Sequence, residues 1–207
     1  GNRKGAVVAI NYQTGAILAA VTTPRFNPNS LATGTEKQSQ QTLKQLQAEP
    51  SKPLLDRALR GEYPPGSSFK IITAAAALEQ QIRTPEDAVE APVSVPLPGS
   101  RARISNIEST SCGNGHPTFS YAFAYSCNTP FAKIGQDLGY QALKDKTEAF
   151  GFNPKTDLKI PLPVQKSYFP SSDPGIASTM MSAIGQYEVR TSPLMMATVA
   201  GAVANQG

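Results

Sequence analysis

The sequence predicts an α+β fold in which a β-hairpin near the start of the chain packs with several later helices. Two short apolar runs around a turn come first, and segments with helical patterns follow. Hydrophobic residues make up 40% of the 207 residues and charged residues 16%, which is typical of a folded globular chain. One hairpin followed by separate helices is typical of the α+β class.

The hairpin is predicted from the apolar runs Gly5–Ile10 and 16–21, which flank the turn-like segment Asn11-Tyr-Gln-Thr-Gly15. Because both runs are apolar almost throughout, we expect most of both faces of the strands to be buried. Residues 23–35 are rich in Pro, Asn, Thr and Gly, and are predicted to form a loop. The polar segment Glu36–Ala48 is predicted to be a solvated surface helix.

A buried helix is predicted over residues 69–81, FKIITAAAALEQQ, because the segment is apolar around nearly its whole circumference. Ser67 and Ser68 precede it as candidate N-caps, after Pro-Pro-Gly. Residues 85–119 contain many Pro, Gly and Ser with short strand-like pieces. Further helices are predicted over residues 121–125, 130–138, 141–150, 173–184 and Pro193–Ala204, the second and third ending near Gly139 and Gly151.

The charge pattern does not indicate a nucleic-acid-binding protein. The net charge is +4, Trp is absent, and Lys and Arg are scattered rather than arranged in a stripe with aromatic residues. A mild positive excess fits an anionic partner or surface without identifying it. No apolar run approaches the roughly 20 residues of a membrane-spanning helix, and no signal peptide is visible.

The two cysteines, Cys112 and Cys127, are 15 positions apart. With His116 they would give too few ligands for a structural zinc site, and the sequence has no second cluster of ligands. We therefore expect a disulfide rather than free thiols, which would place the protein outside the cytoplasm.

Ser67 and Lys70 form an S-x-x-K motif at the start of the predicted buried helix. Positions i and i+3 share a helix face, so the lysine amine can reach the serine oxygen. A neutral amine there would accept the serine proton during attack on a carbonyl carbon, and burial favours the neutral form by lowering the lysine pKa. The simpler interpretation is a capping serine followed by a surface lysine. However, a lysine in the first turn of an apolar helix is costly to bury without a function.

Ser126, Cys127 and Asn128 form a second candidate motif, S-x-N, in a loop between two predicted helices. A serine there can pass a proton to a leaving amine, and an asparagine amide can hold a substrate amide with both donor and acceptor. The alternative is that Asn128 or Thr129 only caps the following helix, with Pro130 in its first turn.

Together the two motifs resemble the penicillin-binding protein and serine β-lactamase superfamily, whose signature is S-x-x-K, S-D-N and K-T-G. Residues 63–70, YPPGSSFK, resemble the nucleophile segment of class B penicillin-binding proteins, and residues 123–131, FAYSCNTPF, resemble their second motif. The turn at 11–15 is similar to the one between their first two strands. AIGQ at 183–186, TSPL at 191–194 and ANQG at 204–207 are similar to the stretch before their third motif. The resemblance covers nearly the whole chain, and the chain looks most like the actinobacterial penicillin-binding protein A group.

The resemblance implies a transpeptidase/β-lactamase-like domain in which a five-stranded antiparallel sheet packs with helices, with only its first two strands in this chain. The third motif, Lys-Thr-Gly or Lys-Ser-Gly, is absent: Lys146-Thr147 is followed by Glu, and Lys155-Thr156 by Asp. We therefore expect residues 1–207 to be the N-terminal portion of the catalytic domain. The missing motif is expected on a C-terminal fragment of the same protein, without which the chain would be inactive.

The implied activity is that of a serine-type D-Ala-D-Ala transpeptidase, which cross-links peptidoglycan stem peptides and is inhibited covalently by β-lactam antibiotics. Ser67 is then the nucleophile, Lys70 its base, Ser126 the proton relay and Asn128 the group that orients the peptide. No cofactor or metal ion is implied. A glycosyltransferase of the wall machinery is an expected partner. The expected location is the extracytoplasmic face of the membrane, with an anchor N-terminal to this chain.

Two alternatives stay open. In a β-lactamase or D,D-carboxypeptidase, water resolves the acyl-enzyme, and a class A β-lactamase needs a deacylating glutamate after the second motif. Glu148 and Glu188 lie there, but neither has the E-x-x-x-N spacing that the resemblance would require. In a β-lactam sensor domain, the serine is acylated without turnover.

Overall fold

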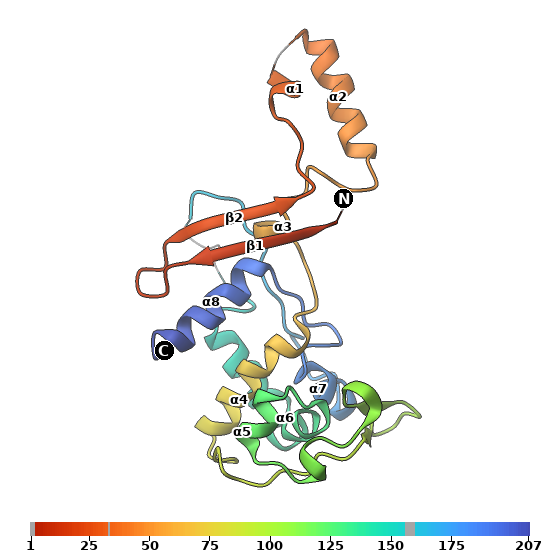
Figure 1. The fold of residues 1–207 in the computed structure, drawn as a ribbon, viewed down its shortest axis with the longest axis vertical. Helices are drawn as coiled ribbons and strands as arrows, with labels where there is room; N and C mark the ends of the chain where they lie inside the picture. The colour runs from red at the N-terminus through yellow and green to blue at the C-terminus, as the bar shows by residue number, and fades with distance from the viewer. Residues whose placement is uncertain (1–2, 33, 156–159) are drawn as a thin grey trace. The chain divides into compact units, whose positions relative to one another are not determined.

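The computed structural model describes residues 3–32, 34–155 and 160–207, and it divides into two compact units (Figure 1). Residues 1–62, 158–165 and 192–207 form the first, which we call the hairpin unit. Residues 63–157 and 166–191 form the second, which contains both motifs and which we call the motif unit. The described residues form many helices and two small antiparallel sheets, as the predicted α+β class requires.

The hairpin unit is built on two antiparallel strands, β1 (Gly5–Ile10) and β2 (Ile17–Thr23), in the predicted position. The turn between them is closed by Asn11, whose side-chain oxygen accepts hydrogen bonds from the backbone of Gln13 and Thr14. The unit also contains α1 (Asn29–Ala32), α2 (Glu36–Ala48), α3 (Arg57–Arg60) and α8 (Pro193–Ala204). Thus the predicted loop at 23–35 includes one short helix, α1.

The expectation that both faces of the hairpin are buried is wrong. Side chains alternate between the two faces of a strand, and here one face packs on the buried residues Leu59 and Leu194. On the other face, the paired residues Val7 and Val21 are 63% and 40% exposed. An apolar run therefore indicated a strand correctly but did not indicate how many of its faces are covered.

Helix α2 is the surface helix that its composition predicts. Thr35 and Gln38 form a capping box at its start, and none of its residues is buried. Helix α8 also has the predicted bounds, with the Ser192 hydroxyl accepting from the backbone N–H of Met195 at its start.

The motif unit contains a core of helices together with a two-stranded sheet. Its elements are η1 (Gly66–Phe69), α4 (Lys70–Glu79), β3 (Ser94–Pro96), β4 (Arg103–Ser105), η2 (Ile107–Ser109), η3 (Gly113–Gly115), α5 (Phe119–Ala124), α6 (Asn128–Ala149) and α7 (Ile176–Ser182). Helix α4 is buried as predicted, and its Ile72, Ala76 and Ala77 are at most 1% exposed. Side chains from α4, α5, α6 and α7 share one hydrophobic core.

Two helix predictions need correction. Ser67 and Ser68 do not cap α4, because the chain enters it through the 3₁₀ turn η1 without a side-chain cap. The predicted break near Gly139 is confirmed: α6 consists of two helical segments that meet at a kink, where Gly139 adopts a non-helical conformation (φ 74°, ψ 167°). Helix α7 covers only Ile176–Ser182 of the predicted 173–184.

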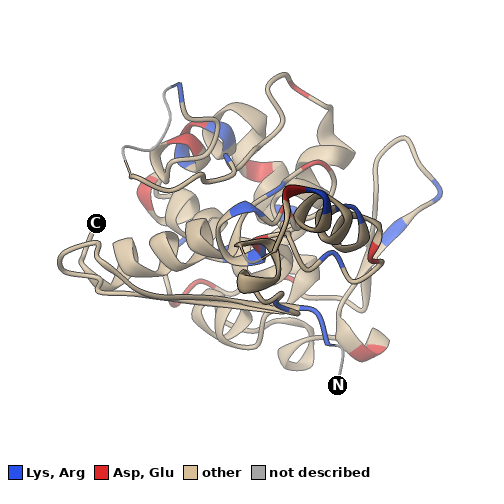
Figure 2. Cartoon of the chain, turned by 90° about the horizontal axis from the view of Figure 1, so that it is seen from above, with Lys and Arg blue, Asp and Glu red and all other residues tan. Residues whose placement is uncertain are grey.

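Figure 2 shows Lys and Arg interspersed with Asp and Glu along the chain. Among the described residues of the motif unit, Arg83 pairs with Asp137, Lys133 with Glu90, Lys144 with Glu148, and Lys146 with Glu79. None of the described helices combines the length and the apolar character needed to cross a membrane.

Candidate active site

Ser67 lies in the 3₁₀ turn η1, at the start of the segment that leads into α4. The next residue but one, Phe69, is fully buried against the rings of Phe152 and Phe169, with centroids 5.9 Å and 6.0 Å away. Ser68 donates its hydroxyl to the carbonyl oxygen of Pro65 at 2.7 Å. The turn is therefore anchored around Ser67, and it holds this serine on a fixed backbone.

Gly185 supports this turn through the backbone. The backbone N–H of Gly66 donates to the Gly185 carbonyl at 2.9 Å. A Cβ atom at Gly185 would lie 2.1 Å from the Gly66 oxygen, and the residue adopts a φ of 70°. The hydroxyl of Thr73 in α4 also donates to the Ala183 carbonyl at 2.7 Å. The AIGQ segment at 183–186 thus packs directly against η1, the turn that carries Ser67. Only glycine fits at position 185.

Lys70 is the first residue of α4, and its side chain is almost completely buried (1% exposed). Its amine donates to three oxygens of the second motif: the carbonyl of Ser126 at 2.6 Å, the hydroxyl of Ser126 at 3.2 Å and Oδ1 of Asn128 at 2.7 Å. It also lies 5.6 Å from the centroid of the Phe131 ring. No carboxylate is among these contacts. Burial lowers the pKa of Lys70 from 10.5 to about 8.

The structure thus brings Lys70 to Ser126 and Asn128, but it does not join Lys70 to Ser67. No hydrogen bond links these two side chains within the described part of the chain, contrary to the expectation from the S-x-x-K spacing. The three N–H donors of a lysine ammonium match the three acceptors of the second motif. In the neutral amine one donor is replaced by a lone pair, which leaves the nitrogen able to accept a proton.

Ser126 and Asn128 occupy the junction between α5 and α6. Ser126 adopts a left-handed backbone conformation (φ 56°), and its N–H donates to the carbonyl of Phe123 at the end of α5. Asn128 is the first residue of α6 rather than part of a loop, and its amide Nδ2 donates to the carbonyl of Ser105 at 3.0 Å. Both ends of the Asn128 amide are therefore engaged, Oδ1 by Lys70 and Nδ2 by β4.

Asn106 is part of the site and was not singled out from the sequence. It follows β4, is 8% exposed, and its Oδ1 accepts from the backbone N–H groups of Asn128 and Thr129 at 2.9 Å and 3.0 Å. In sequence it looks like an ordinary turn asparagine, because these partners are more than 20 positions away.

Cys112 and Cys127 form a disulfide, with their Cα atoms 6.1 Å apart. The middle residue of the second motif is thereby tied to the segment before η3. The described residues contain no group of three or more side chains that could hold a metal ion.

Lys146 and Thr147 lie within α6, where Lys146 pairs with Glu79 and the buried Thr147 bonds the carbonyl of Leu143. They are helix residues and not the strand residues of a third motif. Lys155 precedes a short stretch, beginning at Thr156, that lies outside the described residues.

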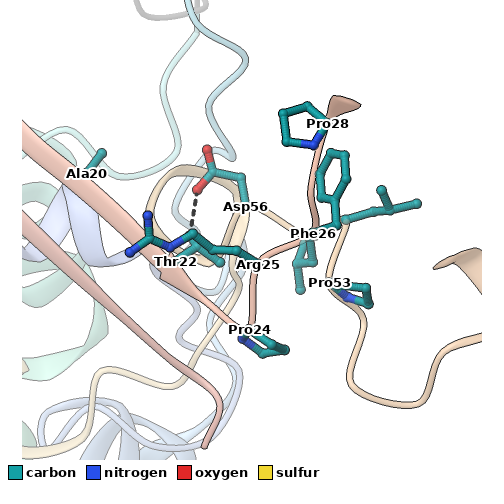
Figure 3. Close-up of a pocket in the computed structure, with 10 residues that line it drawn as sticks. Ala20, Thr22, Pro24, Arg25, Phe26, Pro28, Pro53 and Asp56 are labelled. Carbon is teal, nitrogen blue, oxygen red and sulfur yellow. Dashed lines mark hydrogen bonds between the residues drawn. The ribbon is translucent and has the colours of Figure 1, made fainter. Parts of the chain in front are cut away.

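A pocket in the hairpin unit is distinct from these residues (Figure 3). Its volume is about 320 Å³, and mostly apolar side chains line it, among them Pro24, Phe26 and Leu54. Its carboxylate, Asp56, accepts from Thr22 at 3.0 Å and caps α3. The polar group is thus engaged in the fold, and the pocket contains none of the motif residues.

Residues 5–207 match the family model described as the penicillin-binding protein transpeptidase domain. The chain belongs to this family. It is 42% identical over 208 residues to the peptidoglycan D,D-transpeptidase PbpA of Mycolicibacterium smegmatis, covering 99% of this chain and 41% of the relative. It is 32% identical to the peptidoglycan D,D-transpeptidase MrdA of Acinetobacter baumannii, covering 99% of this chain and 31% of the relative.

The family's solved structures share the fold. The imipenem acyl-enzyme of penicillin-binding protein A from M. tuberculosis has a TM-score of 0.93 and 39% identity, over 99% of this chain and 46% of that one. The D,D-transpeptidase domain of a peptidoglycan glycosyltransferase from Eggerthella lenta has a TM-score of 0.85 and 31% identity, over 99% and 50%. The chain spans about two fifths of the length of the PbpA relatives.

Proposed function

We propose that this chain carries the acyl-transfer residues of a peptidoglycan D,D-transpeptidase that β-lactams inhibit covalently. One observation carries the proposal: a buried lysine amine, free of carboxylate contacts, is held by a serine and an asparagine 56 and 58 positions away. A charged amine is costly at such a place, and a base that works near neutral pH needs a lowered pKa. The relatives' names, and an acyl-enzyme with a β-lactam in one of them, support the same activity.

In the proposed reaction, Ser67 Oγ attacks the carbonyl carbon of the penultimate D-Ala of a stem peptide, and its proton passes to the neutral amine of Lys70. The bond to the terminal D-Ala then breaks. The nitrogen of the departing D-Ala takes a proton from the Ser126 hydroxyl. The Lys70 ammonium returns a proton to Ser126 across the 3.2 Å contact. An amine of a neighbouring stem peptide then attacks the Ser67 ester and forms the cross-link. The proton that this amine loses passes through Ser126 and Lys70 to Ser67 Oγ, which leaves as the hydroxyl.

A β-lactam ring would acylate the same serine, because its strained amide occupies the place of the D-Ala–D-Ala bond. Asn128 is assigned two tasks, anchoring Lys70 through Oδ1 and presenting its remaining Nδ2 hydrogen to the peptide. No residue of this chain is assigned the part of the third motif. The proposed site of action is the cell wall, outside the cytoplasmic membrane.

Glu148 does not support a β-lactamase assignment. Its carboxylate is bound by Lys144 at 2.7 Å and by Asn153 at 3.1 Å, and the hydrogen bond from Lys144 lowers its pKa. It serves to close the end of α6 and is not poised to activate water.

The test uses the complete gene product and a fluorescent penicillin. We expect one adduct per molecule, on the peptide that contains Ser67, and no adduct in Ser67→Ala. Ser68→Ala is the matched control: it should still be labelled on Ser67, with a rate lowered by at most about tenfold, because the lost hydrogen bond to Pro65 helps to hold the turn. A label on Ser68, or none at all, would refute the proposal. An adduct lost within seconds would favour a β-lactamase instead.

A further inference from the structure

Asn106 makes more hydrogen bonds than a turn residue requires. Its Oδ1 accepts from the backbone N–H groups of Asn128 and Thr129, and it lies 3.2 Å from the Thr129 hydroxyl, whose shorter hydrogen bond goes to the carbonyl of Pro92 at 2.9 Å. Its Nδ2 donates to the carbonyls of Pro92 at 2.9 Å and Thr110 at 3.1 Å. The residue is buried, so these bonds are largely shielded from water.

The first role of Asn106 is to cap α6 from a distance. The first N–H groups of a helix have no partner within the helix, and the residue before it usually supplies an acceptor. Here that residue is Cys127, whose sulfur forms the disulfide and makes no capping hydrogen bond. Asn106 supplies the acceptor instead, from 22 positions earlier in the chain.

The capped residue is Asn128, which anchors the amine of Lys70. Asn106 holds the backbone of Asn128, and the neighbouring Ser105 carbonyl holds its Nδ2. Oδ1 of Asn128 is thereby aimed at Lys70, 2.7 Å away. The position of the Lys70 amine thus depends on Asn128. The position of Asn128 depends in turn on residues 105–106.

The same side chain also fixes a strained turn beside the site. Glu108 and Ser109 both adopt left-handed conformations, with φ of 62° and 51°. Such conformations are unfavourable for these residues and persist only where the surroundings hold them. The side chain closes the turn through Nδ2, which donates to the carbonyl of Thr110, while the backbone carbonyl of Asn106 accepts from the N–H of Ser109.

We propose that Asn106 is a positioning residue for acyl transfer: its Oδ1 fixes the start of α6, so that Asn128 holds the amine of Lys70 in reach of the reacting serine. The inference rests on the proposed function. It assigns different effects to the two atoms of the amide. Loss of the acceptor Oδ1 should lower the acylation rate, whereas loss of the donor Nδ2 should lower only the stability of the turn.

Arg57 in the hairpin unit offers a control away from both motifs. Its side chain is buried (4% exposed), and its guanidinium donates to the backbone carbonyls of Ser51, Lys52 and Leu55. Like Asn106 it is a buried polar side chain that holds a neighbouring segment through hydrogen bonds, but none of its partners contacts the residues of either motif.

The experiment compares Asn106→Ala, Asn106→Asp and Arg57→Ala in the complete gene product. The limiting rate of acylation at saturating β-lactam, the half-saturating concentration and the melting temperature are measured for each. In Asn106→Ala we expect the limiting rate to fall by about 10- to 100-fold, the scale of a small misplacement of a catalytic group. The half-saturating concentration should change little. In Arg57→Ala we expect a lower melting temperature and a limiting rate within about twofold of the unaltered protein.

Asn106→Asp keeps the acceptor oxygen and loses the donor. We expect its melting temperature to fall, because a buried carboxylate would face two carbonyl oxygens. A carboxylate here would also favour the charged form of Lys70, so the limiting rate is compared on its high-pH plateau, where it should stay within about threefold of the unaltered protein. Should Asn106→Ala fail to fold, Asn106→Asp decides. A folded Asn106→Asp with a tenfold loss overturns the inference, as does a limiting rate that follows melting temperature across all variants. If the unaltered protein is not acylated, the proposed function fails. If it is acylated and Asn106→Ala matches it, only this inference fails.

Discussion

The amine of Lys70 donates a 2.7 Å hydrogen bond to Asn128 Oδ1, across 58 positions of sequence. This contact joins the first residue of α4 to the first residue of α6. Because α4 begins at Lys70 and α6 begins at Asn128, the packing of the two helices positions both side chains. The position of the Lys70 amine therefore depends on tertiary structure and not on the S-x-x-K spacing alone.

Lys70→Arg should abolish acylation although it keeps the positive charge. A guanidinium does not lose its proton in proteins and cannot serve as a base. Acylation by a fluorescent penicillin over hours measures the loss, which we expect to exceed about 1,000-fold. Lys133→Arg is the control, since Lys133 lies on the surface of α6 and pairs with Glu90. Near-normal acylation of Lys70→Arg would remove Lys70 from the mechanism.

The acylation rate should rise with pH up to about 8 and then level off. Burial lowers the pKa of Lys70 to about 8, so at pH 7 only about one tenth of the molecules carry the neutral amine. The rate should thus increase about tenfold from pH 6 to pH 7. A rate constant that does not vary between pH 6 and pH 8 would contradict a neutral lysine base.

The free energy of unfolding should also depend on pH through Lys70. The pKa of Lys70 is lower in the folded state than in the unfolded state, so between about 8 and 10.5 the unfolded chain binds more protons. The free energy of unfolding contributed by Lys70 therefore increases as pH rises through this window. Below about pH 8 the cost of burying the charged amine is fully present. Urea unfolding of the native protein and Lys70→Met at pH 7 and pH 9.5 would isolate this contribution.

The sequence predicted those features that depend on local pattern. Helix α2 has the polar composition and the cap of a surface helix, and α4 has the apolar circumference of a buried one. Ser67, Lys70, Ser126 and Asn128 were chosen because their residue types and order match a known signature, and the structure brings the last three into contact.

Other features were not predictable because they depend on distant segments. Nothing local to Asn106 indicates that it caps a helix 22 positions later. The two faces of the hairpin have similar composition, so their different burial follows from what packs on them.

The Cys112–Cys127 disulfide should stabilise the fold more than it affects the rate. Closing a loop of 15 residues is worth about 3 kcal/mol in the chain-entropy estimate. The double variant Cys112→Ala/Cys127→Ala should lose about that much in free energy of unfolding. Its acylation rate should stay within about threefold, because Asn106 still holds the start of α6. Urea midpoints with and without reductant provide the measurement; identical midpoints for the native protein would argue against the bridge.

Gly185→Ala should damage both stability and acylation, because two independent costs coincide at this position. A Cβ there would lie 2.1 Å from the Gly66 oxygen and 2.8 Å from Phe69 Cβ, and the backbone φ of 70° is unfavourable for alanine. The conformation costs about 1–2 kcal/mol, and the overlap adds roughly 1–3 kcal/mol because backbone and not a flexible side chain must move. The atoms that must move belong to the turn that carries Ser67, so the nucleophile is displaced with them.

Gly99→Ala is the matched control for Gly185→Ala and isolates the conformational cost. Gly99 has a φ of 73°, and a Cβ atom added there would meet no other atom within 4 Å. We expect Gly99→Ala to lose about 1 kcal/mol in free energy of unfolding, with normal acylation. Gly185→Ala should lose about 3 kcal/mol, and its acylation rate should fall at least about tenfold. Urea unfolding and acylation by a fluorescent penicillin measure the two effects. Equal effects in the two variants would mean that the contact between Gly185 and the nucleophile turn does not support the site.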